Sequence, residues 1–162
     1  MQGSSRKNYT VFIATVIVAM ILDIWPIPDD VVPYWPKWVV LVFIYWCIAL
    51  PHRIGILTGW MIGLFIDVLT GSLLGLNAFC LAIVAYFALT LYQRIRLFPR
   101  WKQSLVIGML VGQYMLISFW LNGLTNPIEK SWSYWLAMVT SAAIWPYVFL
   151  LLRDVRRRFR VN

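Results

Sequence analysis

Residues 55–71 read GILTGWMIGLFIDVLTG and contain a single charged side chain, that of Asp67. An α-helix rises about 1.5 Å per residue, and the hydrocarbon core of a bilayer is about 30 Å thick. A helix of this length can therefore cross a membrane if it stands nearly upright or if the bilayer thins around it. The stretch predicts a short transmembrane helix.

Similar uncharged runs lie on both sides of this stretch. With it they make six expected spans, at residues 9–25, 34–50, 55–71, 73–92, 104–124 and 132–152. Apolar and aromatic residues make up 62% of the 162 residues, and charged residues 12%, about half the share found in soluble domains. We therefore expect one all-α integral membrane domain over residues 1–162. It is a bundle of six transmembrane helices followed by a basic tail at residues 153–162.

The positions of Lys and Arg predict the orientation. With the N-terminus inside, all but two of the 14 basic residues fall on the same side, and only Lys37 and Lys130 fall outside. This predicts a bacterial inner-membrane protein with both termini in the cytoplasm. The net charge of +8 comes from helix ends, which argues against a nucleic-acid-binding face. Lipid-facing basic anchors are expected at Arg94, Arg96, Arg100, Lys102, Arg156, Arg157 and Arg158.

Small residues recur every four positions around Asp67. The series is Gly59, Gly63, Asp67, Gly71 and Gly75, and residues four apart share one face of a helix. Such a face lets a second backbone approach closely, so we expect a packing seam. A central Asp costs roughly 2.5 to 3.5 kcal/mol, so Asp67 should face the bundle interior or a water-filled cavity. Two interpretations stay open: part of a partner site or cavity, or a carboxylate bonded to a neighbouring helix.

Other polar positions carry weaker signals. Pro51, His52 and Arg53 predict a tight inner turn, in which Pro51 ends the second span and Arg53 meets the lipid headgroups. The role of the single histidine stays open. Asp23 lies near the outer edge, where solvation at the interface explains its charge. Pro146 should kink the last span.

The sequence contains no recognisable catalytic, cofactor-binding or metal-binding motif. It has no glycine-rich phosphate loop, no HExxH or CxxC, and no second acid at the depth of Asp67. Cys47 and Cys80 lie inside expected spans and should be free buried thiols. We expect a protein that is not an enzyme and that needs no cofactor or metal.

Several short motifs, spread over nearly the whole chain, resemble one family. They are Pro36-Lys37-Trp38-Val39, Tyr45-Trp46, Ala49-Leu50-Pro51-His52-Arg53, Gly59, Gly63, Asp67, Gly71-Ser72, Leu74-Gly75 and Trp145-Pro146. With the length and span count, they resemble the rod shape-determining MreD family in its gammaproteobacterial branch.

This resemblance implies a fold and a function. The fold would be similar to the membrane S-subunits of energy-coupling-factor transporters. The function would be that of a scaffold in the rod, or elongasome, complex, which binds MreC directly. Through MreC it would couple MreB to peptidoglycan synthesis by RodA and a penicillin-binding transpeptidase, and so regulate cell shape. On this hypothesis the seam at Asp67 accepts a partner helix.

A different function is also open at this point. The chain could be a small-molecule-binding or transport subunit that uses a bundle cavity around Asp67. The sequence leaves open the oligomeric state, the helices that contact MreC, the packing order and the occupant of any cavity.

Overall fold

The computed structural model describes residues 2–28, 30–123 and 132–159, and within these ranges every regular element is a helix. Two short 3-10 helices accompany the six main helices. In order the elements are α1 (Gln2–Ile24), η1 (Val32–Tyr34), α2 (Trp38–Ala49), α3 (Ile56–Thr70), α4 (Leu76–Leu97), α5 (Arg100–Gly123), η2 (Trp132–Trp135) and α6 (Leu136–Arg158). The expected six-helix bundle is confirmed. The predictions for Lys130 and for the last three residues lie outside the described part of the chain.

The helices have the length and composition of membrane spans. Four stretches are long and apolar enough to cross a membrane: Val32–Ala49, Leu76–Leu97, Arg100–Gly123 and Leu136–Arg158. Two shorter apolar helices, Tyr9–Ile24 and Ile56–Thr70, accompany them. The fold is that of a multi-pass α-helical membrane protein.

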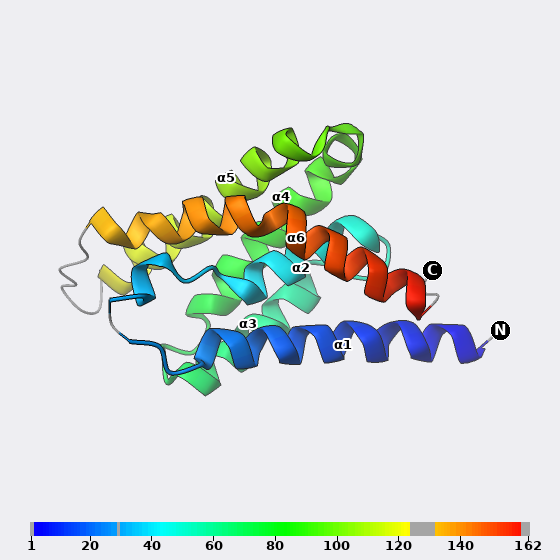
Figure 1. Cartoon of the computed structure of the whole chain (residues 1–162). Coiled ribbons are helices and arrows are strands. Elements are labelled where there is room, and N and C mark those ends of the chain that lie inside the picture. The colour runs from blue at the N-terminus through cyan, green and yellow to red at the C-terminus, as the bar shows by residue number, and fades with distance from the viewer. Residues whose placement is uncertain (1, 29, 124–131, 160–162) are drawn as a thin grey trace.

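Both termini lie at the same end of the molecule, because the six helices run back and forth along one direction (Figure 1). The connection between α2 and α3, the turn between α4 and α5, and the last turns of α6 lie at this end, which we call the basic end (Figure 1). Asp23 and Asp67 lie toward the opposite end, which we call the aspartate end.

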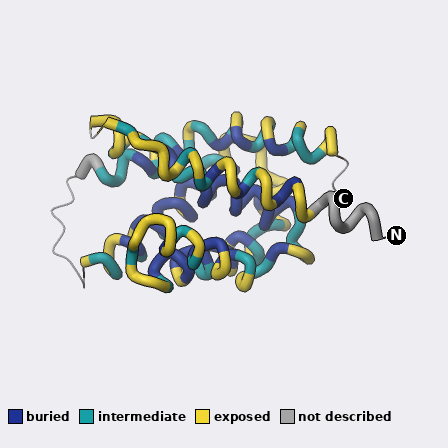
Figure 2. The backbone as a smooth tube through the Cα atoms, turned by 90° about the horizontal axis from the view of Figure 1, so that it is seen from below, coloured by how far each residue is buried: buried dark blue, intermediate teal, exposed yellow. Residues whose placement is uncertain are grey.

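Helix α2 forms the centre of the bundle. Every residue from Val39 to Ala49 is buried, and α2 contacts α1, α4, α5 and α6. Figure 2 shows buried backbone inside the bundle and exposed backbone around it. Twelve residues of helix span only about 18 Å, less than a bilayer core. The remaining thickness is left to the non-helical chain on either side of α2, which is tolerated within a membrane where protein surrounds it.

Several helix ends differ from the expected spans, and prolines and glycines account for most of the differences. Helix α2 begins at Trp38, after Pro36, and ends before Leu50, whose helical conformation the following Pro51 disfavours. Helix α4 begins at Leu76 because Gly75 before it adopts a left-handed φ of 100°.

The basic segments are more helical than expected. Helix α4 continues to Leu97 and α5 begins at Arg100, so only Phe98 and Pro99 connect them. Helix α6 runs unbroken through Pro146 to Arg158, so most of the expected basic tail is its last turns. Cys47 and Cys80 are free and buried, as predicted.

Candidate functional site: carboxylates that tie the helices together

The Asp67 carboxylate is buried near the end of α3, with 1% of the residue exposed. Its Oδ1 accepts hydrogen bonds from the Ser72 hydroxyl (2.8 Å) and from the backbone and side-chain nitrogens of Asn77 (3.0 and 2.9 Å). Its Oδ2 accepts from the backbone N–H groups of Gly75 (2.8 Å) and Ala78 (3.4 Å). The interpretation of Asp67 as an interior carboxylate bonded to a neighbouring helix is therefore confirmed.

These bonds cap α4 from another helix. The first N–H groups of a helix have no partner within it, and the N-cap residue here, Gly75, has no side chain to offer. Asp67 supplies the acceptors, and its negative charge lies at the positive end of the α4 dipole. Charge-assisted bonds of this kind replace the water that the carboxylate loses on burial.

The turn that makes this contact possible depends on two glycines. Gly71 ends α3 and Gly75 precedes α4, and both have positive φ angles, of 63° and 100°. L-residues with a side chain rarely adopt this conformation, and glycine adopts it without a steric cost. The chain therefore reverses within a few residues and brings the start of α4 beside Asp67.

A buried hydrogen-bond chain extends from the carboxylate to a third helix. The Asn77 side chain donates to Asp67, and its oxygen accepts from the Tyr114 hydroxyl of α5 at 2.5 Å. Asn77 and Tyr114 are both buried. The chain thus links α3, α4 and α5. The sequence analysis did not single out either residue, although an Asn in an apolar run is a signal for such a network.

The glycine seam is a close contact, but it is made within the chain. A Cβ at Gly63 would overlap the backbone of Ala78, and one at Gly59 would lie 2.7 Å from Phe43 Cζ and 3.0 Å from the Leu81 carbonyl oxygen. Helix α4 thus occupies the face on which the sequence analysis expected a partner helix. Gly71 and Gly75, predicted to extend the seam, instead form the turn. That expectation is corrected.

Asp23 repeats the arrangement of Asp67 in the preceding pair of helices. Its Oδ1 and Oδ2 accept the backbone N–H groups of Trp38 and Val39, both at 3.1 Å, which are the first two of α2. The N-cap residue of α2, Lys37, provides no side-chain cap. Solvation at the membrane interface, proposed from the sequence, is therefore an incomplete account, because Asp23 caps the central helix.

A cavity of about 450 Å³ opens at the aspartate end. Its polar lining residues are Asp23, Lys37, Thr70, Asn77, Tyr114, Ser118 and Tyr134. Asp67 is not among the lining residues, because its carboxylate is occupied by α4. A cavity exists as the alternative function requires, but it lies beside Asn77 and not around Asp67.

At the basic end the predicted turn and anchors are partly in the expected places. The predicted turn after α2 is present, with Arg53 N–H donating to the Leu50 carbonyl at 3.1 Å, and His52 is exposed. Arg96 is an exception among the expected lipid anchors. Its guanidinium donates to the carbonyl oxygens of Ile48 (3.0 and 2.5 Å) and Ala49 (3.1 Å), which end α2.

The remaining anchors differ in their exposure. Besides Arg96, six residues were expected to face lipid. Arg156 is half-buried, and the other five are exposed: Arg94, Arg100, Lys102, Arg157 and Arg158. Lys102 also lies over the ring of Trp101, 5.2 Å from its centroid.

These features define a class of protein: a multi-pass helical membrane protein whose adjacent helices are joined by carboxylate caps. Within the described ranges, no group of three or more His, Cys, Asp or Glu side chains could hold a metal ion. The chain matches the family model for the rod shape-determining protein MreD over residues 5–155, and it belongs to the MreD family.

A curated relative supports the assignment along the whole chain. The chain is 31% identical, over the full length of both proteins, to the rod shape-determining protein MreD of Haemophilus influenzae. No solved structure matches the chain. The family resemblance found in the sequence is thus confirmed, and the likeness to transporter S-subunits stays a prediction.

Proposed function

We propose that the chain is a non-enzymatic inner-membrane subunit of the rod complex, which binds MreC directly. Through MreC it couples MreB to peptidoglycan synthesis by RodA and a penicillin-binding transpeptidase. The observation that carries the proposal is the full-length family match, since this family determines rod shape. The fold supports it, because the buried polar groups at Asp67 bond to one another and serve the architecture.

The MreC contact belongs on the outer faces of the peripheral helices. The glycine face of α3 is covered by α4, and α2 is enclosed on all sides. Exposed apolar side chains remain on α1, α3, α5 and α6, for example Ile21, Trp60, Leu116 and Tyr147. One of these faces accepts the single transmembrane helix of MreC, and the others face lipid.

A crosslinking scan tests this proposal. A photo-reactive amino acid is placed at Ile21, Trp60, Leu116 and Tyr147 in turn, in intact membranes, and adducts with MreC are identified by mass spectrometry. We expect adducts from one or two neighbouring faces and rounded cells when the protein is depleted. The proposal fails if no face yields an MreC adduct and depleted cells stay rod-shaped.

The proposed orientation has a separate test. The basic end holds both termini, and Lys and Arg are retained on the cytoplasmic side of bacterial membranes. A fluorescent protein that folds only in the cytoplasm should therefore fluoresce when fused to the C-terminus. Alkaline phosphatase at the same position should be inactive. An active phosphatase fusion contradicts the orientation.

The second candidate function rests on the cavity at the aspartate end. About 450 Å³ with several polar lining groups is enough for a small molecule. Native mass spectrometry of the gently solubilised protein separates the two functions. A small molecule retained at a fixed stoichiometry, without MreC, favours a binding or transport subunit. Retained MreC favours the scaffold.

A further inference from the structure

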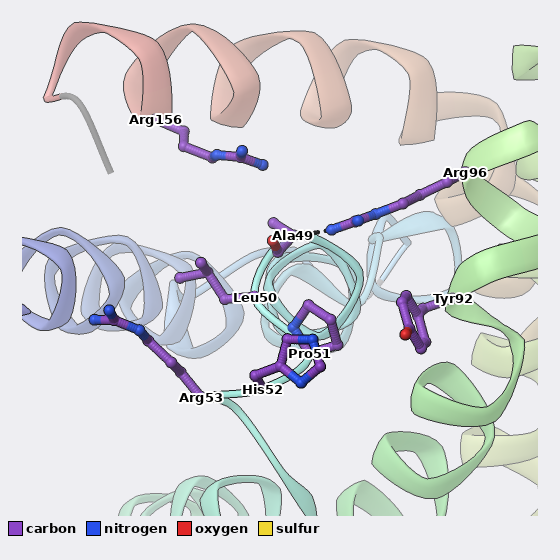
Figure 3. Close-up of a pocket in the computed structure, with 8 residues that line it drawn as sticks. All are labelled: Ala49, Leu50, Pro51, His52, Arg53, Tyr92, Arg96 and Arg156. Atoms are coloured by element: carbon purple, nitrogen blue, oxygen red, sulfur yellow. Dashed lines mark hydrogen bonds between the residues drawn. The ribbon is translucent and has the colours of Figure 1, made fainter. Parts of the chain in front are cut away.

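A second cavity, of about 420 Å³, surrounds the C-terminal end of α2 at the basic end (Figure 3). Three arginines from separate parts of the chain line it: Arg53 after α2, Arg96 on α4 and Arg156 on α6. Leu50 and Pro51 contribute apolar surface. Arg96 and Arg156, which are far apart in the sequence, both approach the end of α2 here, whereas the Arg53 side chain points away from them (Figure 3).

Two of these arginines are held in place by other contacts. Arg96 donates through Nε and Nη2 to the end of α2 and lies over the ring of Tyr92, 5.6 Å from its centroid. Arg156 interacts with the Tyr45 hydroxyl. In Figure 3 the two side chains point toward Ala49 from opposite sides. An arginine fixed in this way loses little side-chain entropy when it binds a ligand.

The charge around the pocket is strongly positive. The lining residues include three arginines and His52 but no carboxylate, among the residues that the structure describes. Asp154, on the same helix as Arg156, is paired with Arg153 at 3.8 Å. The carbonyl end of α2 carries about half a negative charge, which Arg96 more than offsets. The pocket therefore favours an anion.

We propose that this pocket binds the phosphate group of an anionic phospholipid. A guanidinium has five N–H donors in a planar fork that matches phosphate oxygens, and the bonds to α2 leave Nη1 of Arg96 able to donate. The pocket lies at the end of the bundle, where helices leave the bilayer. Its apolar walls favour a lipid over a soluble phosphate, because they can contact the glycerol and the first acyl carbons.

Native mass spectrometry of the purified full chain, with added phosphatidylglycerol, tests the proposal. Arg156→Gln should lower retention of the first lipid about fivefold, the loss expected when one direct hydrogen bond to the phosphate is removed. Arg157→Gln is the matched control, because Arg157 is exposed on the same turn and does not line the pocket. We expect less than a twofold effect. Should Arg156→Gln fail to fold, Arg156→Lys keeps the charge but loses the planar fork, and should lower retention about threefold.

Three results would overturn the proposal. Equal losses for Arg156→Gln and Arg157→Gln would mean that only the total charge of this end matters. Equal retention of zwitterionic phosphatidylethanolamine would show that the pocket does not select anionic headgroups. Displacement of phosphatidylglycerol by inorganic phosphate or glycerol 1-phosphate at equal concentration would assign the pocket to a soluble phosphate compound. The function in cell shape does not depend on any of these outcomes.

Discussion

Replacing Asp67 with Asn should loosen the start of α4. The carboxylate accepts five hydrogen bonds through two oxygens, whereas an amide has one oxygen and one NH₂ group. If the amide oxygen takes the place of Oδ1, the NH₂ group faces the N–H groups of Gly75 and Ala78, and donor meets donor. In the reverse orientation, the NH₂ group faces the donors of Ser72 and Asn77 instead.

The size of the effect follows from these bonds. A buried donor left without a partner costs about 1 to 3 kcal/mol, and the remaining bonds lose their charge assistance, each losing about 1 kcal/mol. The neutral side chain is easier to bury, which offsets part of this cost. We expect the free energy of opening the α3–α4 contact to fall by about 2 to 4 kcal/mol.

Cys80 provides a local measurement. It lies on α4 one turn after Asn77 and is fully buried, while Cys47 on α2 is also buried and serves as an internal reference. In detergent, the rate at which a maleimide dye labels Cys80 in Asp67→Asn should rise about 30-fold or more, since each 1.4 kcal/mol is a factor of ten. Labelling of Cys47 should change less.

The matched control removes a carboxylate that no described contact requires. Asp30 is exposed in the turn after α1, so Asp30→Asn should leave both labelling rates within about twofold. If Asp67→Asn also leaves the Cys80 rate within twofold, the carboxylate does not hold α4, and the account of the site is wrong.

Three further predictions test the packing and the network. Gly63→Ala should lower the unfolding temperature in detergent, because the added Cβ meets the Ala78 backbone. Overpacking of this kind lowers the free energy of unfolding by about 1 to 3 kcal/mol. The control Gly55→Ala should leave the unfolding temperature unchanged, because nothing lies within 4 Å of the added Cβ. Equal decreases for the two variants would contradict the close contact of α3 with α4 at Gly63. Tyr114→Phe leaves the Asn77 oxygen without its donor and should cost about 1 to 3 kcal/mol in the same assay, so an unchanged stability would remove Tyr114 from the network.

Hydrophobic patterning was enough to predict the six helices, because the bilayer demands long apolar runs. It was also enough to place Asp67 inside the bundle, since a charge facing lipid is costly. The partner of Asp67 could not be predicted in the same way. The spacing of Gly59 and Gly63 shows that some backbone approaches closely, but it carries no information about which one. Only the fold shows that it is α4.

Other errors came from features that depend on contacts between separate helices. The spacing of four continues to Gly75 although the helix ends at Thr70, so periodicity alone extended the seam too far. Asp23 resembles any interfacial acid in the sequence, because its partners Trp38 and Val39 lie beyond a proline-rich turn. Arg94 and Arg96 are both exposed, and only the hydrogen bonds of Arg96 to the end of α2 distinguish them.

The central helix shows why these caps matter for the whole protein. Helix α2 is buried from Val39 to Ala49, and backbone groups at both of its ends are bonded to side chains of other helices. Asp23 places a negative charge at its amino end, and Arg96 places a positive charge at its carboxyl end, each complementary to the helix dipole. Both charges come from neighbouring helices, α1 and α4. The caps thus bind the peripheral helices to the centre and leave the outer faces of those helices exposed.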